Sequence, residues 1–115
     1  MRHYLLLLRG GKPMAAKTDE ENAAEMLAWG EYMGKLSEGG NLAGGLPLRP
    51  EGSVVSATGI VAEPVSSSSE GIVGGYLLLN AESLEHACEL VKDCPHIVNQ
   101  GSIEVREVAA PESMN

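Results

Sequence analysis

Residues 3–9 read His-Tyr-Leu-Leu-Leu-Leu-Arg and contain the longest apolar run near the amino terminus. Apolar side chains occupy both alternations of this run, which predicts a central strand that is covered on both faces. Gly10, Gly11 and Pro13 end it. The run is far shorter than the roughly 20 residues that a membrane-spanning helix needs. No small-residue cleavage site follows it, so we expect no signal peptide.

Two further stretches predict strands. Residues 72–79 are apolar throughout apart from Gly74 and Gly75, which indicate a bulge or a close backbone approach. Residues 102–108 alternate between apolar and charged side chains, which is typical of a strand with one solvated face. Together with the first run, these segments predict three long strands.

Two segments have the pattern of amphipathic helices. The sequence Thr18-Asp19-Glu20-Glu21 fits a capping box and predicts a helix over residues 19–38. Its apolar residues recur at helical spacing and predict one buried stripe, made of Ala23, Met26, Leu27, Gly30, Met33 and Gly34. A second helix is expected to begin after Ser83 and to end at Pro95. Its expected stripe is Leu84, Ala87, Cys88 and Val91.

The middle of the chain is less regular. Residues 41–48 hold short apolar pieces that are broken by glycine and proline, and they predict no regular element. Residues 53–63 predict a hairpin that turns near Thr58-Gly59. Residues 64–71 include four consecutive serines and predict an exposed, mobile loop.

The order strand, helix, hairpin, strand, helix, strand predicts an α+β fold. Helices packed on one face of an antiparallel sheet bury both the helical stripes and one face of the sheet. This is a ferredoxin-like sandwich, expected as a single domain over residues 2–108, with a flexible tail at 109–115. The other face of the leucine-rich first strand would stay exposed, so we expect a homodimer that pairs sheet to sheet.

Composition excludes several classes of function. The 115-residue chain carries a formal charge of −8, and its eight basic residues are scattered singly. Nucleic acids and anionic membrane surfaces are bound through clustered lysine and arginine, so neither is an expected partner. The histidines and cysteines lack zinc-site spacing, and no glycine-rich fingerprint for phosphate or dinucleotide occurs. We therefore expect no metal, no cofactor and a cytoplasmic protein, in which Cys88 and Cys94 stay reduced.

Several segments resemble a known family. They are Tyr4–Leu8, Gly74–Leu79, Glu82–Glu85, Cys94-Pro95 and Gly101–Arg106. Over about residues 2–108 the chain resembles the DGPF-type, YCII-related proteins. The resemblance implies a ferredoxin-like subunit that pairs through its sheet into a dimeric α+β barrel. Most members lack an assigned reaction, although relatives include decycling and dehalogenating enzymes of aromatic breakdown and proteins that accompany sigma factors.

The chain departs from the family pattern at two places. The tetrapeptide that names the DGPF-type proteins corresponds to Ala62-Glu63-Pro64-Val65, which lacks the Asp, the Gly and the Phe. The resemblance to the enzymatic branch also implies a His on the first helix and an Asp before the proline after the second. Here the first helix holds no His, and Cys94 precedes Pro95, with Asp93 one position earlier. These departures weaken the interpretation as an enzyme.

The candidate catalytic residues are His96 and Asp93. An unperturbed imidazole titrates near neutral pH, so His96 can act as a general acid or base that Asp93 orients. The alternative, which we favour, is that His96 satisfies free carbonyls at a helix end. Cys94 beside His96 is a possible nucleophile. A packed, inert thiol is favoured there, because the negative end of a helix raises a thiol pKa.

The candidate ligand-binding residues are Tyr76, Trp29 and Met33. They can line a pocket between the sheet and the first helix, or they can simply be core and dimer contacts. Three functions follow. The first is a small-molecule binding or sensing module. The second is a lyase or isomerase that acts on a cyclic or aromatic acid through His96, and the third is a structural or interaction subunit. A deep cavity near Tyr76 and His96 would favour the first two functions, whereas a filled aliphatic interior would favour the third.

Overall fold

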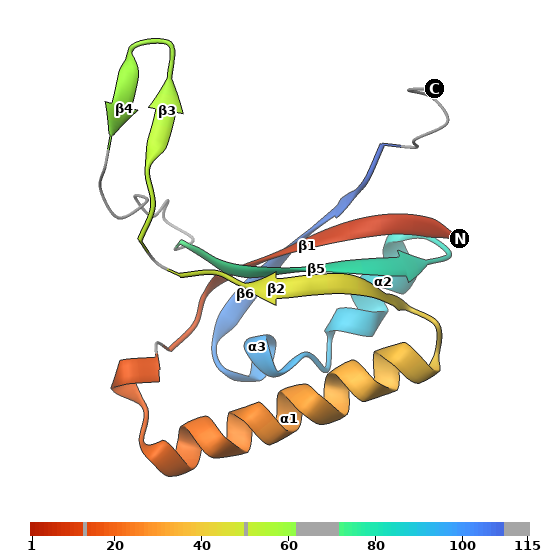
Figure 1. Ribbon diagram of the computed structural model, residues 1–115. Helices are drawn as coiled ribbons and strands as arrows, with labels where there is room; N and C mark the ends of the chain where they lie inside the picture. Colours follow the sequence, from red (N-terminus) through yellow and green to blue (C-terminus); the bar gives the residue numbers. More distant parts are fainter. Residues whose placement is uncertain (13, 50, 62–71, 110–115) are drawn as a thin grey trace.

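The computed structural model describes residues 1–12, 14–49, 51–61 and 72–109. Its centre is a four-stranded antiparallel sheet of order β2-β5-β1-β6 (Figure 1). The strands are β1 (Arg2–Gly10), β2 (Leu42–Pro47), β5 (Val73–Ala81) and β6 (Gly101–Glu107). The helices are α1 (Asp19–Glu38), α2 (Leu84–Val91) and α3 (Pro95–Val98), with one 3-10 turn, η1 (Met14–Ala16), before α1. The helices lie on one face of the sheet, which confirms the ferredoxin-like α+β fold.

Strand β1 occupies the centre of the sheet because both of its alternations are apolar. It pairs with β5 on one side and with β6 on the other. Tyr4, Leu6 and Leu8 are buried and face the helices. Leu5 and Leu7 point to the opposite face and are half-buried. A strand with polar residues at every second position could not bury one face and still offer leucines on the other.

Strand β5 repeats this arrangement beside β1. Leu77 and Leu79 are buried against the helices, whereas Tyr76 and Leu78 alternate to the other face. The register sets Leu5 against Leu78 and Leu7 against Tyr76. Leu46 of β2 pairs with Tyr76 and is 61% exposed. We call the surface made by Leu5, Leu7, Leu46, Tyr76 and Leu78 the outer face of the sheet.

Helix α1 has the expected bounds but buries a different side. Thr18 accepts from the Glu21 backbone N–H, and the Glu21 carboxylate accepts from the Thr18 backbone N–H, which completes the capping box. The expected stripe was wrong except at Met33: Met26 is 73% exposed and Leu27 is 71% exposed. Tyr32 and Leu36 are buried instead, with Trp29 and Met33 partly buried beside them. The side with the larger rings and aliphatic chains buries more area than the glycine-containing side, so tertiary packing selects it.

Helix α2 begins after Ser83, whose side chain caps it as expected. It ends at Val91 rather than at Pro95, so the expected end was wrong. Pro95 is instead the first residue of α3. Proline suits the first position of a helix, because the N–H that it lacks would have no partner there. Of the expected stripe, Ala87 and Val91 are buried, whereas Leu84 and Cys88 are exposed.

Strand β2 had no counterpart among the expected elements, yet it forms one edge of the sheet. Close packing against β5 explains why residue 45 is a glycine. A Cβ at this position would lie 2.6 Å from Leu77 Cδ2, and the Gly45 φ of 156° is rare for other residues. The expected hairpin does form, as β3 (Val54–Ser56) and β4 (Gly59–Val61), but as a separate two-stranded sheet. The expected mobile loop at 64–71 and residues 110–115 of the expected tail lie outside the described residues.

Candidate functional site

The layer between the sheet and the helices is filled by side chains. Its main buried cluster consists of Leu6, Leu8, Tyr32, Leu36, Leu77, Leu79, Val91 and Cys94. Trp29 and Met33, two of the expected ligand-binding residues, pack partly buried against this cluster. The Trp29 and Tyr32 rings meet edge to face, with their centroids 5.9 Å apart. Both candidates therefore contribute to the core in this subunit.

Tyr76 lies on the outer face of the sheet, away from Trp29 and Met33. Residues alternate between the two faces of a strand, and Leu77, the buried neighbour of Tyr76, points to the helices. The expectation that these three aromatic and apolar residues share one pocket wall was therefore wrong. Ligand binding by any one of them stays a prediction.

His96 is held by backbone groups at the far end of β1. Its Nε2 donates a hydrogen bond of 2.8 Å to the Arg9 carbonyl oxygen. The ring also packs so closely on Gly101 that a Cβ there would collide with it. This is a variant of the structural role that sequence analysis favoured, since His96 satisfies a carbonyl at the end of a strand rather than at the end of its helix. Its catalytic role stays a prediction.

Asp93 lies elsewhere, in an open groove between α1 and α3 with a volume of about 500 Å³. The groove is lined by Lys17, Glu21, Ala24, Glu25, Ala28, Glu31, Tyr32, Lys35, Asp93, Pro95, Val98 and Asn99. His96 is not among these residues, so the structure does not bring the two catalytic candidates to one surface. Sequence reasoning missed the other polar residues of the groove. Most lie on α1, where charged residues are typical of a solvated helix face, and Lys17 and Asn99 lie in the segments beside α1 and α3.

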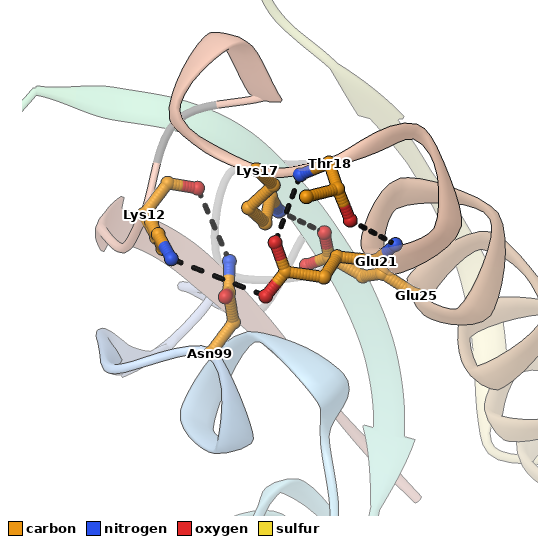
Figure 2. A network of polar contacts seen from close by, with 6 residues as sticks. All are labelled: Lys12, Lys17, Thr18, Glu21, Glu25 and Asn99. Atoms are coloured by element: carbon orange, nitrogen blue, oxygen red, sulfur yellow. Dashed lines mark hydrogen bonds and ion pairs between the residues drawn. The ribbon is translucent and has the colours of Figure 1, made fainter.

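Polar contacts tie together the three segments at one end of the groove (Figure 2). Lys17 forms an ion pair with Glu25, and Lys12 Nζ lies 4.0 Å from a Glu21 carboxylate oxygen. The Asn99 amide donates to the Lys12 carbonyl oxygen at 3.2 Å. The segment before α1, the first turns of α1 and the end of α3 are therefore held in one arrangement.

The side chains of the groove carry more negative than positive charge. Two lysines and four acids line it. The Thr18 backbone N–H, and after it the Lys12 ammonium, lowers the pKa of Glu21, so this carboxylate stays ionised in mild acid. Burial first, and then the charge that Cys94 would carry as a thiolate and the charge of Asp93, raises the pKa of Tyr32. The Tyr32 hydroxyl therefore stays protonated and donates to the Leu90 carbonyl oxygen at 2.7 Å.

Cys94 is fully buried and lies in the chain between the groove residues Asp93 and Pro95. Burial raises the pKa of its thiol, although backbone N–H groups of His96 and Ile97 act in the opposite direction. Sequence analysis attributed the inert thiol of Cys94 to the negative end of a helix, and this reason was wrong. Cys94 sits at the amino end of α3, not at the carboxyl end of α2, so desolvation rather than a helix dipole keeps it protonated.

The described residues contain neither a metal-binding cluster nor a membrane-spanning helix. Within residues 1–12, 14–49, 51–61 and 72–109, no group of three or more His, Cys, Asp or Glu side chains could hold a metal ion. No helix in that part of the chain has the length and apolar character to cross a membrane.

Known proteins are similar to this chain in family and in fold. No curated protein matches it. Among solved structures, it resembles the 5-chloro-2-hydroxyhydroquinone dehydrochlorinase TftG from Burkholderia phenoliruptrix AC1100, solved in complex with 2,5-dihydroxybenzoquinone. The TM-score is 0.52 at 16% identity, and the match covers 96% of this chain and 97% of that one, which shows a shared fold. The model of the YCII-related domain matches residues 3–111, so the chain belongs to the YCII-related family.

Proposed function

We propose that this protein is a small-molecule binding module whose site is the groove between α1 and α3. The observation that carries the proposal is that the groove gathers charged and amide side chains from α1 and from the segments beside α1 and α3, with Tyr32 also in its lining. Ligand sites characteristically combine a concave surface, an apolar patch and a few polar groups that fix orientation. The ion pairs and hydrogen bonds of Figure 2 hold one end of the groove in place before a ligand arrives.

The charge of the groove favours an uncharged ligand with hydroxyl groups. The carboxylates of Glu31 and Asp93 can accept hydrogen bonds from hydroxyl groups of a ligand, and the Lys35 ammonium can donate to a ligand hydroxyl or carbonyl oxygen. The excess of acids disfavours a carboxylate ligand, because like charges repel in a partly enclosed site. The structurally similar dehydrochlorinase acts on a hydroxyhydroquinone, which is a ring compound of this kind. We therefore extend the proposal to hydroxylated aromatic rings.

The second part of the proposal is a homodimer through the outer face. Leu5, Leu7, Tyr76 and Leu78 are only half-buried there, and the helices of this subunit cover the opposite face. An apolar surface of this kind on a soluble chain usually marks an interface. Pairing two outer faces around a twofold axis would bury both at once.

Ligand binding in the groove is tested with a panel of ring compounds. Hydroquinone, catechol and 1,2,4-trihydroxybenzene represent the proposed class, and benzoate represents the anionic alternative. We expect at least one hydroxylated ring to raise the melting temperature and to bind in calorimetry, with benzoate showing no effect. Asp93→Asn should weaken that binding about tenfold, because a charged hydrogen-bond acceptor is lost.

Glu85→Gln is the matched control, because Glu85 is an exposed acid on α2 outside the groove. Its affinity should equal that of the unaltered protein. No binding by any hydroxylated ring would contradict the proposed ligand class, and equal affinity in Asp93→Asn would contradict the groove. Turnover of a bound ring that His96→Ala abolishes would favour the lyase or isomerase alternative. If no compound of the panel binds and the protein still dimerises, the result would favour an interaction subunit, in line with the filled interior.

A further inference from the structure

The β3–β4 hairpin stands apart from the rest of the subunit. It projects from the sheet on the side away from the helices, at the top left of Figure 1. Val55 and Ile60 face each other across its two strands, and each is 70% exposed. Val54 is 49% exposed. Residues 52–61 include no charged side chain, in a chain whose residues are 21% charged. The tip of the subunit is therefore apolar and uncharged.

Among the described residues, the extensive contacts of this hairpin are those between its own two strands. A two-stranded hairpin in water is marginal at best, and independent stability needs a further strand or a packed face. Because Val55 and Ile60 are exposed, the hairpin lacks the apolar burial that would stabilise it. Within the described residues no packed face supplies that burial, which favours a partner surface.

We propose that the hairpin is an arm that packs against a second copy of this chain. The inference rests on the homodimer of the proposed function and adds an element to it. The hairpin rises on the same side of the sheet as the outer face. A second subunit that docks on the outer face would therefore lie beside the hairpin, and twofold symmetry would give it an arm of its own that reaches back.

The charge of the chain also favours a second copy of this chain as the partner of the hairpin. Two chains of formal charge −8 repel each other, so they can approach closely only through uncharged surfaces. The outer face between β2 and β5 is such a surface, because Leu46, Tyr76 and Leu78 carry no charge. The charged side chains of this face lie on the β6 side, where Glu104 is opposite Leu7 and Arg106 is opposite Leu5, and at Arg9 of β1, which pairs with Glu104. Because β2 ends at Pro47 and the hairpin begins at Val54, the arm starts beside the uncharged part of the outer face.

The test is the dimer dissociation constant of the variant Val55→Thr/Ile60→Thr, measured by analytical ultracentrifugation over a concentration series. Threonine keeps the β-branched shape and the strand preference but removes apolar surface. Twofold symmetry makes each substitution count twice, so we expect the dissociation constant to rise about 100-fold. Met26→Gln/Leu27→Thr is the matched control, because Met26 and Leu27 are 73% and 71% exposed but lie on α1, across the sheet from the arm. The control should change the constant less than twofold.

Amide hydrogen exchange gives a second readout. The hairpin amides should be protected at high protein concentration and should lose that protection on dilution below the dissociation constant. If the unaltered protein sediments as a 12.1 kDa monomer at every concentration, the homodimer and its arm are both overturned. If it dimerises and the hairpin variant dimerises equally well, the arm is overturned while the homodimer stands. Ligand binding in the α1–α3 groove is measured separately, so its failure leaves either result readable.

Discussion

The imidazole Nε2 of His96 donates a hydrogen bond of 2.8 Å to the carbonyl oxygen of Arg9. A carbonyl can only accept, so Nε2 carries a hydrogen and, in the neutral ring, Nδ1 is left as the acceptor. The contact joins α3 to the end of β1, 87 residues apart in the chain. His96, the candidate general acid or base, is thus also a structural link between the helical layer and the sheet.

We expect His96→Ala to lower the free energy of unfolding by about 1 kcal/mol, because the part-buried hydrogen bond to the Arg9 carbonyl is lost. Urea denaturation measures the change. Val98→Ala is the control on the same helix, since Val98 is 78% exposed, and it should cost much less. Any loss of turnover in His96→Ala must therefore be measured on protein that is shown to be folded. Equal stability of the two variants would refute the structural link.

Tyr32→Phe should destabilise the protein by roughly 1 kcal/mol while leaving the core packed. The substitution keeps the ring that contacts Trp29 and removes only the hydroxyl that donates to the Leu90 carbonyl. Chemical denaturation of the variant checks the value. A variant as stable as the unaltered protein would show that the hydroxyl makes no net contribution.

The two thiols should differ sharply in reactivity. Iodoacetamide at neutral pH is expected to alkylate Cys88, which is exposed, and to spare Cys94 in the folded protein. Intact-mass spectrometry counts the adducts, and both thiols should react in denaturant. Rapid alkylation of Cys94 under native conditions would contradict its burial.

Cys94 also makes stability depend on alkaline pH. Burial raises the pKa of its thiol above the ordinary value of about 8.5, so the folded state favours the protonated form. The contribution is fully present below that ordinary value and is lost as the pH rises through the pKa of the folded state. Cys94→Ala should show a smaller loss of melting temperature between pH 8 and pH 10 than the unaltered protein shows.

The amino end of α1 should be sensitive to acid. Thr18→Ala removes the cap and is expected to lower the free energy of unfolding by about 1 kcal/mol, whereas Ser37→Ala in the last turn should lower it less.

The pKa of Glu21 is lowered in the folded state, so the contribution of its carboxylate to stability is present above an ordinary pKa of about 4.3 and is lost as the pH falls. The stability difference between the unaltered protein and Glu21→Gln should therefore shrink below pH 4. A difference that is constant from pH 3 to pH 7 would be evidence against the capping carboxylate.

Local patterns were enough to predict most of the architecture. The double alternation of residues 3–9 marks a central strand, and the capping box at Thr18 marks the start of a helix that ends as expected at Glu38. The turn near Thr58-Gly59 also appears as predicted. Each of these signals depends on neighbours within a few residues, so it can be interpreted before the partners in space are known.

The positions of the candidate residues depended on packing between distant segments. Gly44 and Gly45 suggest a turn, yet they lie in edge strand β2 because the neighbouring β5 backbone approaches too closely for a side chain at Gly45. Helix α1 buries Tyr32 and Leu36 rather than Met26 and Leu27, since burial follows the shape of the opposing layer and not helical spacing alone. Because alternate residues of β5 face opposite sides of the sheet, Tyr76 points away from the helices. The α1–α3 groove exists only because Pro95 opens a third helix against α1, a contact between segments some 60 residues apart that no local pattern encodes.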